Sequence, residues 1–267
     1  MATRTFQPHA VVMTASITPP PNAPGLKRSD PAVRMRDYLE AFSFYLSLPD
    51  HAVDRVVLLE NTDTDLSPFR ELASKEQGRK RVELIGFQAN DHDPNLGKGY
   101  GEFRMLDIGL ERSVLLREPS PMWKVTGRLK IRNLARLIET APRSYLVYCD
   151  LRYVPVFADR ISGNRWMDLR VASWTPAGYD RYLRGKYPEL RNQFRPQGNI
   201  GPEDYLYARM REALSTLPDH GIVPRFRIQP IIDGFGGNHN LSYQSRKYKA
   251  KELVRAASRR LTPWLWL

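Results

Sequence analysis

The chain has 267 residues, 42% apolar and 26% charged, the composition of an ordinary globular protein with room for one large domain. A formal net charge of +12 favours a polyanionic partner: nucleic acid, an anionic membrane surface or a phosphorylated substrate. The single cysteine excludes an intramolecular disulfide, and no apolar run approaches the ~18–20 residues of a membrane span.

Strands and helices alternate along the first ninety residues. A β-rich apolar run at 9–17 predicts a buried first strand, and apolar residues at helical spacing predict a helix over 34–48. Strands at 54–62 and 81–88, with a short helix at 65–76 between them, continue the series. Strand, helix, strand, helix, strand in this order is typical of a mostly parallel α/β sheet flanked by helices. We predict that fold class.

The rest of the chain continues the mixture of elements. We expect a strand or hairpin at 122–131, strands at 144–152 and 165–175, and helices at 102–116, 131–139, 175–187 and 201–214. Cys149, inside an apolar strand, is expected in the core. Because no linker-like stretch interrupts the pattern, we predict one domain over residues 1–242 and a C-terminal tail over 243–267.

The stretch GKGYGE at 97–102 places three glycines and a lysine between the third predicted strand and the next helix. Glycine is used where the backbone takes positive φ or approaches another group closely. Backbone amides at a glycine-rich helix entrance, with one lysine, suit a phosphate. The spacing matches neither the P-loop nor the dinucleotide GxGxxG motif. We interpret it as a phosphate site of another kind; the alternative is a tight turn with a solvated lysine.

Polar residues follow several predicted strands at the points where these strands end. Ligands of open α/β sheets bind beyond the carboxyl ends of the strands. We therefore expect these polar residues to converge on one edge: Thr18, Glu60, Asn61, Thr62, residues 90–102, Asp150 and Arg152. For Asp150 and Arg152 the alternative is an exposed ion pair between the two.

Six pieces of the sequence, read in chain order, resemble bacterial glycosyltransferase-like proteins of surface-polysaccharide loci. They are TASITPP, RSDPAVR, LLENTDTDL, GKGYGEFRMLDIGLE, KVTGRLKIRNL and LVYCDLR, and they cover roughly residues 10–180. The resemblance implies a Rossmann-like fold of the GT-A type. It also implies a nucleotide diphosphate sugar as donor, and a glycan or lipid-linked acceptor.

The resemblance and the strand-end argument together give the predicted donor site: Thr18, Arg28, Glu60, Asn61, Gly97, Lys98, Gly99, Gly101, Glu102, Lys124, Arg128 and Arg152. Such enzymes usually hold the diphosphate through a metal on a DxD motif. The matching strand end here reads Asp150-Leu151-Arg152, so an arginine replaces the second carboxylate. One carboxylate is a weak site for Mg²⁺ or Mn²⁺, whereas lysine and arginine can neutralise a diphosphate directly. We therefore predict no metal site.

Inverting sugar transfer also needs a base that takes the proton of the acceptor hydroxyl. Members of the resembling group often carry the base in an acidic pair at a helix start, a setting that Glu203 and Asp204 occupy. Asp150 and Glu102 compete for the same role. The alternative for the pair is structural, because acidic residues in a first turn stabilise the helix dipole.

The tail concentrates positive charge, with seven basic residues and one acidic residue between 246 and 260. Four apolar residues can share one helix face, and two tryptophans follow: Leu253, Val254, Ala257, Leu261, Trp264 and Trp266. Such a helix suits an anionic membrane surface. The alternative is a helix packed on the domain with its basic face in water. Because the first residues lack a secretory signal, we expect a cytoplasmic protein, peripheral on the inner face of the membrane.

Two other functions fit the same charge. A nucleic-acid-binding protein or nuclease would use the basic surface on phosphates, and a noncatalytic module would bind a sugar nucleotide without turning it over. The chain has no zinc-finger or RNP motif and no clustered carboxylates for two metals, so we expect no nucleic acid. Its five histidines lack metal-ligand spacing. His239 lies in a second glycine-rich loop, which we interpret as an ordinary surface loop; the alternative is a loop that closes over the site.

Overall fold

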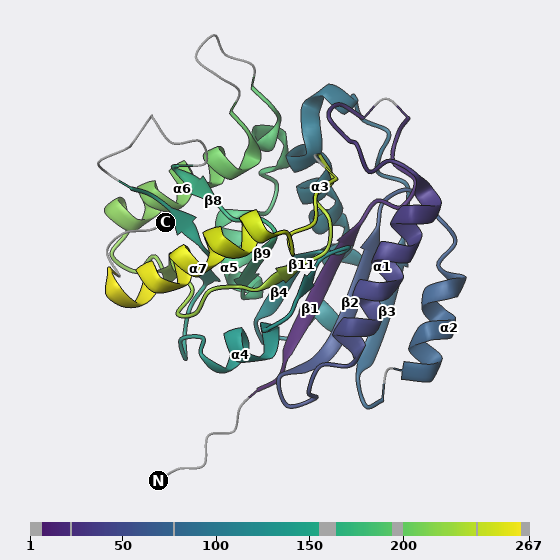
Figure 1. Cartoon of the computed structure of the whole chain (residues 1–267), viewed down its shortest axis with the longest axis horizontal. Helices are drawn as coiled ribbons and strands as arrows, with labels where there is room; N and C mark the ends of the chain where they lie inside the picture. The colour runs from purple at the N-terminus through teal and green to yellow at the C-terminus, as the bar shows by residue number, and fades with distance from the viewer. Residues whose placement is uncertain are drawn as a thin grey trace.

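A computed structural model describes residues 7–21, 23–76, 78–154, 164–193, 200–238 and 240–262. The central sheet of this part has seven strands, in the order β10 (Ile222–Val223), β6 (Val147–Tyr148), β9 (Val171–Trp174), β4 (Met122–Thr126), β1 (His9–Ala15), β2 (Val53–Glu60) and β3 (Arg81–Gly86) (Figure 1). Neighbours pair in parallel except around β9, which runs antiparallel to both β4 and β6. This confirms the predicted mostly parallel, Rossmann-like α/β fold.

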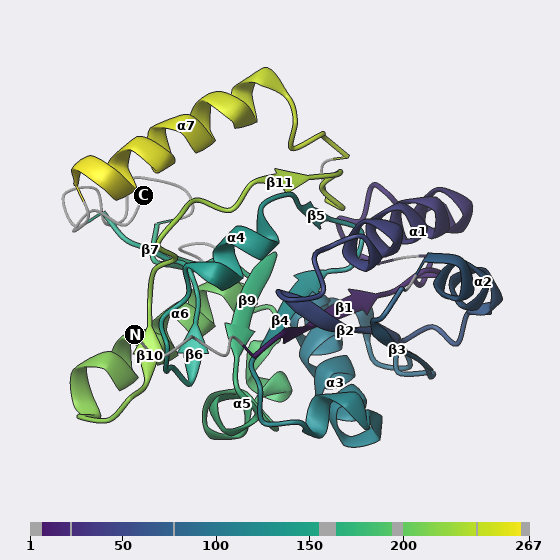
Figure 2. The same cartoon turned by 90° about the horizontal axis from the view of Figure 1, so that it is seen from below.

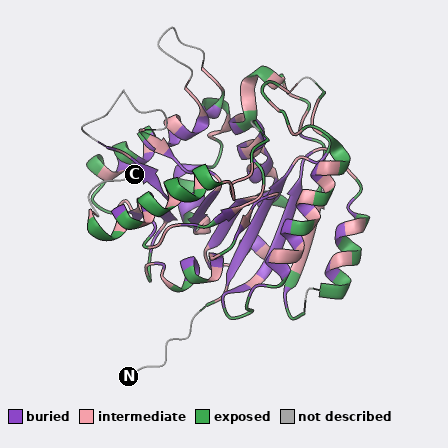
Figure 3. Ribbon diagram, in the orientation of Figure 1, coloured by how far each residue is buried: buried purple, intermediate pink, exposed green. Residues whose placement is uncertain are grey.

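Helices cover both faces of the sheet (Figure 2). One layer holds α1 (Pro31–Leu46), α2 (Ser67–Glu76) and α4 (Leu134–Glu139), and the other holds α3 (Gly97–Arg112), α5 (Pro176–Tyr182) and α6 (Pro202–Thr216). Successive side chains of β1 point to opposite faces of the sheet. Val11 and Met13 pack into the core on the α1 side, and Ala10 and Val12 pack into the core on the α3 side. Burial of both faces explains why these strands read as continuous apolar runs, and Figure 3 shows the central strands as buried.

Helix α1 begins three residues before the predicted start. Asp30 caps it, accepting from the backbone amides of Ala32 at 2.8 Å and Val33 at 3.1 Å, and Pro31 occupies the first helical position. The predicted apolar face is buried, with Tyr38 and Phe42 at 2% and 0% exposure. Truncating a buried phenylalanine such as Phe42 to alanine typically costs ~3–5 kcal/mol, so this face holds α1 on the sheet.

The predicted strand at 144–152 is wrong as a single element. It divides into β6 and β7 (Leu151–Arg152), and β7 pairs outside the main sheet with β8 (Trp166–Met167). The ladder to β10 ends at Pro224, which accepts from the Leu151 amide at 2.9 Å but has no N–H to donate. Cys149, beside this division, is buried in the core as expected.

Two other predicted strands also differ. The segment 165–175 divides into β8 and β9, with Asp168, Leu169 and Arg170 between them. The segment 122–131 forms no hairpin: β4 lies in the main sheet, while β5 (Lys130–Ile131) pairs antiparallel with β11 (Ile232–Asp233).

The glycine-rich stretch does not precede the helix as predicted but forms its start. Short 3-10 turns, η1 (Pro94–Leu96) and η4 (Tyr187–Leu190), pack beside α3; a third, η2 (Leu115–Arg117), follows it. Gly97 has a φ of +86°, which favours glycine. A Cβ at Gly99 would lie 2.4 Å from Pro202 Cβ and 2.7 Å from the Leu190 carbonyl oxygen. The glycines therefore let α3 approach η4 and α6 closely.

The tail forms α7 (Arg246–Leu261), which lies on the α4 side of the sheet (Figure 2). Its inner face buries Arg255 and Ser258, and Arg259 Nη2 lies 2.5 Å from Asp150 Oδ2. No helix among the described residues is both long and apolar enough to cross a bilayer. His239, Trp264 and Trp266 lie outside the described residues.

Candidate functional site

A cavity of about 560 Å³ lies at the edge of the sheet where the parallel strands end. Thr14 in β1 and Ser16 just after it line the cavity, as do Asn61 after β2 and Asn90 after β3. Thr126 at the end of β4 and Arg128 two residues later line it too. Cavities of roughly 300–1,000 Å³ are usual for small-molecule and cofactor sites. The place and size of the cavity suit a ligand as large as a nucleotide.

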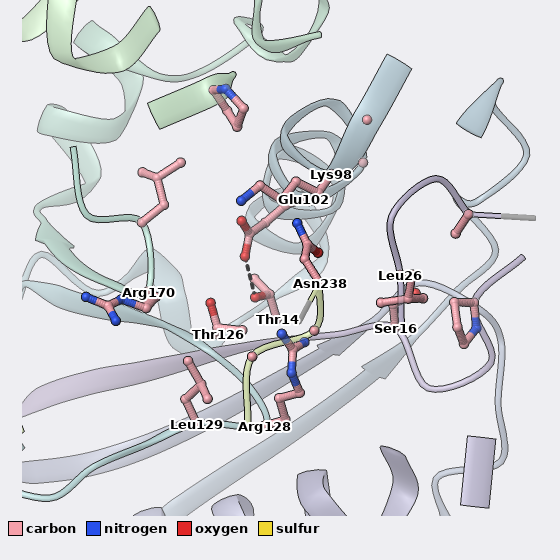
Figure 4. A pocket seen from close by; sticks show the side chains of 18 of the residues that line it. Thr14, Ser16, Leu26, Lys98, Glu102, Thr126, Arg128, Leu129, Arg170 and Asn238 are labelled. Atoms are coloured by element: carbon pink, nitrogen blue, oxygen red, sulfur yellow. Dashed lines mark hydrogen bonds between the residues drawn. The ribbon is translucent and has the colours of Figure 1, made fainter. Parts of the chain in front are cut away.

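The second and sixth residues of α3 face this cavity (Figure 4). Glu102 accepts a hydrogen bond from Thr14 Oγ1 at 2.8 Å and pairs with Lys124 Nζ at 2.6 Å. Lys124 is 1% exposed, donates also to the Leu169 carbonyl at 2.5 Å, and does not line the cavity. Lys124 is thus positioned to support Glu102 rather than to contact a ligand.

Lys98 pairs with Glu203 across the cavity wall, with 2.5 Å between Nζ and Oε1. The lysine side chain is 60% exposed, whereas that of Glu203 is 10% exposed. Desolvation by the surrounding cavity wall opposes the positive charge of the Lys98 ammonium, but the Glu203 carboxylate more than offsets this and raises the pKa of the lysine. The pair gives the cavity a fixed carboxylate beside an accessible cation.

Arg128 supplies the cation nearest to the end of β4. Its Nε donates to the Phe235 carbonyl at 3.2 Å, and no carboxylate of the described residues pairs with it. Gly237 lies against the guanidinium, since a Cβ there would be 2.7 Å from Nη2. In Figure 4 the Arg128 side chain lies next to Asn238 in the cavity. Its charge is therefore available to an anionic ligand.

At another part of the cavity, Arg152 and Arg170 share Asp168. Arg152 Nη2 lies 2.6 Å from Asp168 Oδ2, and Arg170 donates through Nε at 2.9 Å and Nη2 at 2.5 Å. Burial favours a neutral Asp168, but the two arginines together hold the pKa of its carboxyl well below the usual range. Asp168 and Arg170 were missed in the sequence because they lie inside an apparent single strand.

Glu60 and Thr18 shape the strand ends without lining the cavity. Glu60 is fully buried and accepts from the backbone amides of Ile17 at 3.0 Å, Thr62 at 3.0 Å and Thr64 at 3.1 Å. The Thr18 amide donates to Thr62 Oγ1 at 3.1 Å. This carboxylate therefore stabilises the loops that follow β1 and β2.

Arg28 and Asp204 likewise have partners away from the cavity. Arg28 forms a two-point pair with Asp37, at 2.5 and 2.7 Å, and donates to Asn240 Oδ1 at 2.8 Å. Asp204 accepts from the Gly201 amide at 3.0 Å and so caps its own helix. Burial raises the pKa of the Asp204 carboxyl.

Asp150 turns away from the cavity, although Arg152 lines it. Asp150 is 2% exposed and pairs with Arg259, while Arg152 pairs with Asp168. The alternative of an exposed Asp150–Arg152 ion pair is therefore wrong. The remaining predicted residues, Asn61, Gly97, Gly101 and Glu102, line the cavity; Gly99 does not.

The residues of the cavity do not fit a resident divalent cation. Within the described ranges, no three His, Cys, Asp or Glu side chains gather closely enough to hold a metal ion. The two carboxylates that line the cavity, Glu102 and Glu203, already pair with lysines. Substrate phosphates can supply part of the oxygen shell of Mg²⁺ or Mn²⁺, so what the described residues lack is a preformed metal site, and positive side chains line the cavity as well.

No protein-family model and no curated protein matches the sequence of this chain. Among solved structures, the mannosyltransferase PcManGT from Pyrobaculum calidifontis, in complex with GDP-Man and Mn²⁺, is similar at 12% identity and a TM-score of 0.45. The similarity covers 97% of this chain but only 65% of the mannosyltransferase, slightly under two thirds of its length.

Two further solved structures have the same TM-score of 0.45. The galactosyltransferase LgtC, in complex with donor and acceptor sugar analogs, is 9% identical, with 92% of this chain and 95% of LgtC covered. The inositol-1-phosphate CTP transferase from T. maritima is 16% identical, with 91% and 94% covered. These distant likenesses include both sugar and nucleotidyl transfer, so the functional argument depends on the residues of the cavity.

Proposed function

We propose that this protein is a glycosyltransferase that moves a sugar from a nucleotide diphosphate sugar to a cell-surface polysaccharide or lipid-linked acceptor. One observation carries the proposal: Arg128 and the Lys98–Glu203 pair line a single cavity at the carboxyl edge of a Rossmann-like sheet. The sequence pieces that resemble polysaccharide-locus glycosyltransferases support the same conclusion.

In this proposal the donor diphosphate lies between Arg128 and Lys98. Departure of the nucleotide leaves negative charge on its terminal phosphate, and fixed cations at that point stabilise the transition state. Asn61, Gly97 and Gly101 form the wall around it. Thr18, Arg28, Glu60 and Lys124 act indirectly, by holding the strand-end loops and Glu102.

Glu203 is our proposed base for an inverting transfer, with Glu102 as the competing carboxylate. The acceptor oxygen forms a bond to the sugar carbon as the bond from that carbon to the diphosphate oxygen breaks, and the hydroxyl proton passes to the base. Lys98 Nζ lies 2.5 Å from Glu203 Oε1 and holds this carboxylate in place at the cavity wall. Asp150 and Asp204 are poorly placed for the role, because neither lines the cavity.

We further propose that the protein is cytoplasmic and binds the inner membrane surface through α7. The outer face of this helix exposes Leu253, Val254 and Leu261 at 71%, 61% and 76%. Four of the five exposed basic residues of α7 accompany them: Arg246, Lys247, Lys249 and Arg260. Apolar and basic side chains on one face suit an anionic lipid surface, where a lipid-linked acceptor would also lie.

Incubation with a panel of nucleotide sugars, followed by mass spectrometry, tests the activity. We expect hydrolysis of one donor class to free sugar and nucleoside diphosphate. Glu203→Gln should lower that rate by roughly 10²–10⁴-fold, as loss of a general base does. Glu71→Gln is the matched control, since Glu71 also pairs with a lysine, Lys75 at 2.7 Å, but on an exposed helix face.

Two outcomes would overturn the proposal. One is the absence of turnover for every nucleotide sugar, with product instead from a nucleoside triphosphate and a sugar phosphate, which would indicate a nucleotidyltransferase. The other is cleavage of DNA or RNA oligonucleotides in the same assay, as the nuclease alternative requires. A loss of rate in Glu102→Gln but not in Glu203→Gln would instead move the base to Glu102.

A further inference from the structure

A second group of cations lines the cavity beneath α7. It consists of Arg152, Arg170, Lys251 and Arg255, and we call it the α7 cluster. Arg152 lies in β7 and Arg170 precedes β9, whereas Lys251 and Arg255 are one helical turn apart on α7. In Figure 4 Arg170 appears apart from Lys98 and Arg128, on the other side of Thr126.

The α7 cluster carries more positive charge than its neighbours neutralise. Asp168 pairs with both Arg152 and Arg170, and Glu252 pairs with Arg255 at 2.7 Å. Within the described ranges Lys251 has no salt bridge. Four cations thus face two carboxylates, which leaves a surplus of two positive charges, the charge of a phosphate dianion.

Burial makes this surplus costly without a ligand. The side chains of Arg152 and Arg255 are each 9% exposed, and Arg152 Nε has no hydrogen-bond partner among the described residues. Lys251 is exposed at the rim of the cavity, where partial desolvation, followed by the charges of Arg255, Arg152 and Arg170, lowers its pKa. Unneutralised charges in a low-dielectric environment repel one another strongly, so an anion bound among them would relieve this repulsion.

The position of the α7 cluster indicates which anion it binds. Arg128 and Lys98 already supply cations at the strand ends, where the proposed donor lies. Lys251 and Arg255 belong instead to the helix whose outer face exposes Leu253 and Val254. We propose that the α7 cluster is an acceptor subsite that holds the phosphate or diphosphate group of the acceptor substrate. This inference rests on the proposed function, and it assigns Arg152 to the acceptor subsite rather than to the donor site.

Calorimetry on the full chain can separate the two anion subsites. The protein is first titrated with UDP, GDP and CDP, and then, saturated with the one that binds, with inorganic pyrophosphate. We expect pyrophosphate to bind the nucleotide-saturated protein with 1:1 stoichiometry. Lys251→Gln should weaken this binding about tenfold, as for one lost charge-assisted hydrogen bond. Lys249→Gln, exposed on the same helix and outside the cavity, should leave it within about twofold.

Pyrophosphate binding that nucleotide abolishes would overturn the inference, because the α7 cluster would then hold the donor diphosphate. Equal affinities in wild type and Lys251→Gln would overturn it too. Failure of all three nucleotides to bind would count against the proposed function alone, since pyrophosphate can still be titrated into the nucleotide-free protein and its variants. Geranyl diphosphate and a sugar 1-phosphate, titrated in the same way, distinguish a lipid-linked from a soluble acceptor.

Discussion

Lys98 and Glu203 form an ion pair of 2.5 Å although they lie 105 positions apart in the chain. Each belongs to the first turn of its helix, α3 or α6. The two helix starts meet because Gly99 has no side chain to keep Pro202 away. The glycine-rich stretch therefore has a structural role that sequence alone did not reveal: it sets the distance between the lysine and the carboxylate.

Replacing Lys98 should weaken donor binding. We expect Lys98→Ala to reduce the affinity for the nucleotide sugar, or for its nucleoside diphosphate, by ~1–3 kcal/mol, typical of a charge-assisted contact to phosphate. Isothermal calorimetry measures the change. Lys75→Ala is the matched control, since Lys75 is 64% exposed and also paired with a glutamate. Unchanged affinity in folded Lys98→Ala would remove the lysine from the donor site.

Chelation should leave donor binding intact. The carboxylates of the cavity pair with lysines, and Arg128 has no carboxylate partner among the described residues, so the diphosphate has protein cations as partners. We expect nucleotide affinity and sugar release to stay within about twofold after EDTA treatment, a change of less than ~0.5 kcal/mol. Activity that disappears with EDTA and returns with Mg²⁺ or Mn²⁺ would contradict this prediction.

Periodicity and strand-end logic predicted much of the fold and part of the site. The apolar runs of β1 and β2 and the buried face of α1 were readable because both faces of the sheet are covered there, whereas β3 is a half-exposed edge strand. Since parallel strands end at one edge, Asn61 and Lys98 could be predicted to share a site, and they line one cavity with Arg128, which the resemblance had added.

Long-range pairing accounts for what the sequence could not predict. Asp150 follows its strand as a ligand residue would, yet Arg259, 109 positions later, turns it away from the cavity. Asp168 lies within a run that reads as one strand, so its role between Arg152 and Arg170 had no local signal. Glu60 lies at the strand end as predicted, but its carboxylate accepts hydrogen bonds from backbone amides and does not face the cavity.

His9 should make stability fall in mild acid. Burial, followed by the positive charge of Arg55, lowers its pKa from 6.5 to about 4, and Trp123 Nε1 donates to its Nδ1 at 2.9 Å. Well above pH 6.5 the imidazole is neutral in both the folded and the unfolded chain, so it does not make the free energy of unfolding depend on pH. Below it, the unfolded chain gains a proton that the folded protein does not, and by pH 5 the free energy of unfolding should drop by about 2 kcal/mol.

Urea unfolding at pH 8 and pH 5 isolates this contribution. His9→Asn removes the titrating group and retains a side-chain acceptor for Trp123, so wild type and variant share every other titration. The difference in unfolding free energy between the two proteins should shift by about 2 kcal/mol between these pH values, in favour of the variant at pH 5. A difference that does not vary with pH would show that His9 titrates normally in the folded state.

The outer face of α7 should bind anionic vesicles, with an electrostatic and an apolar contribution to the binding free energy that salt can separate. Each basic residue near an anionic surface contributes ~1 kcal/mol, and Arg246, Lys247, Lys249 and Arg260 are exposed. Salt above ~0.5 M screens this term, since the Debye length then falls well below 10 Å. Burial of the exposed apolar side chains of α7 in the lipid interface is not screened. Binding should therefore weaken with salt without disappearing, and should favour anionic over neutral lipid.

Substitutions on the exposed face test this better than deletion of the tail, because deletion would leave Asp150 buried without Arg259. Replacing Leu253, Val254 and Leu261 by glutamine should abolish the salt-resistant part of vesicle co-sedimentation while sparing hydrolysis of a soluble donor. Val114→Gln with Ile231→Gln is the control, since these side chains are 65% and 51% exposed outside α7. If the triple variant still co-sediments at high salt, α7 does not insert into lipid and its outer face has another partner.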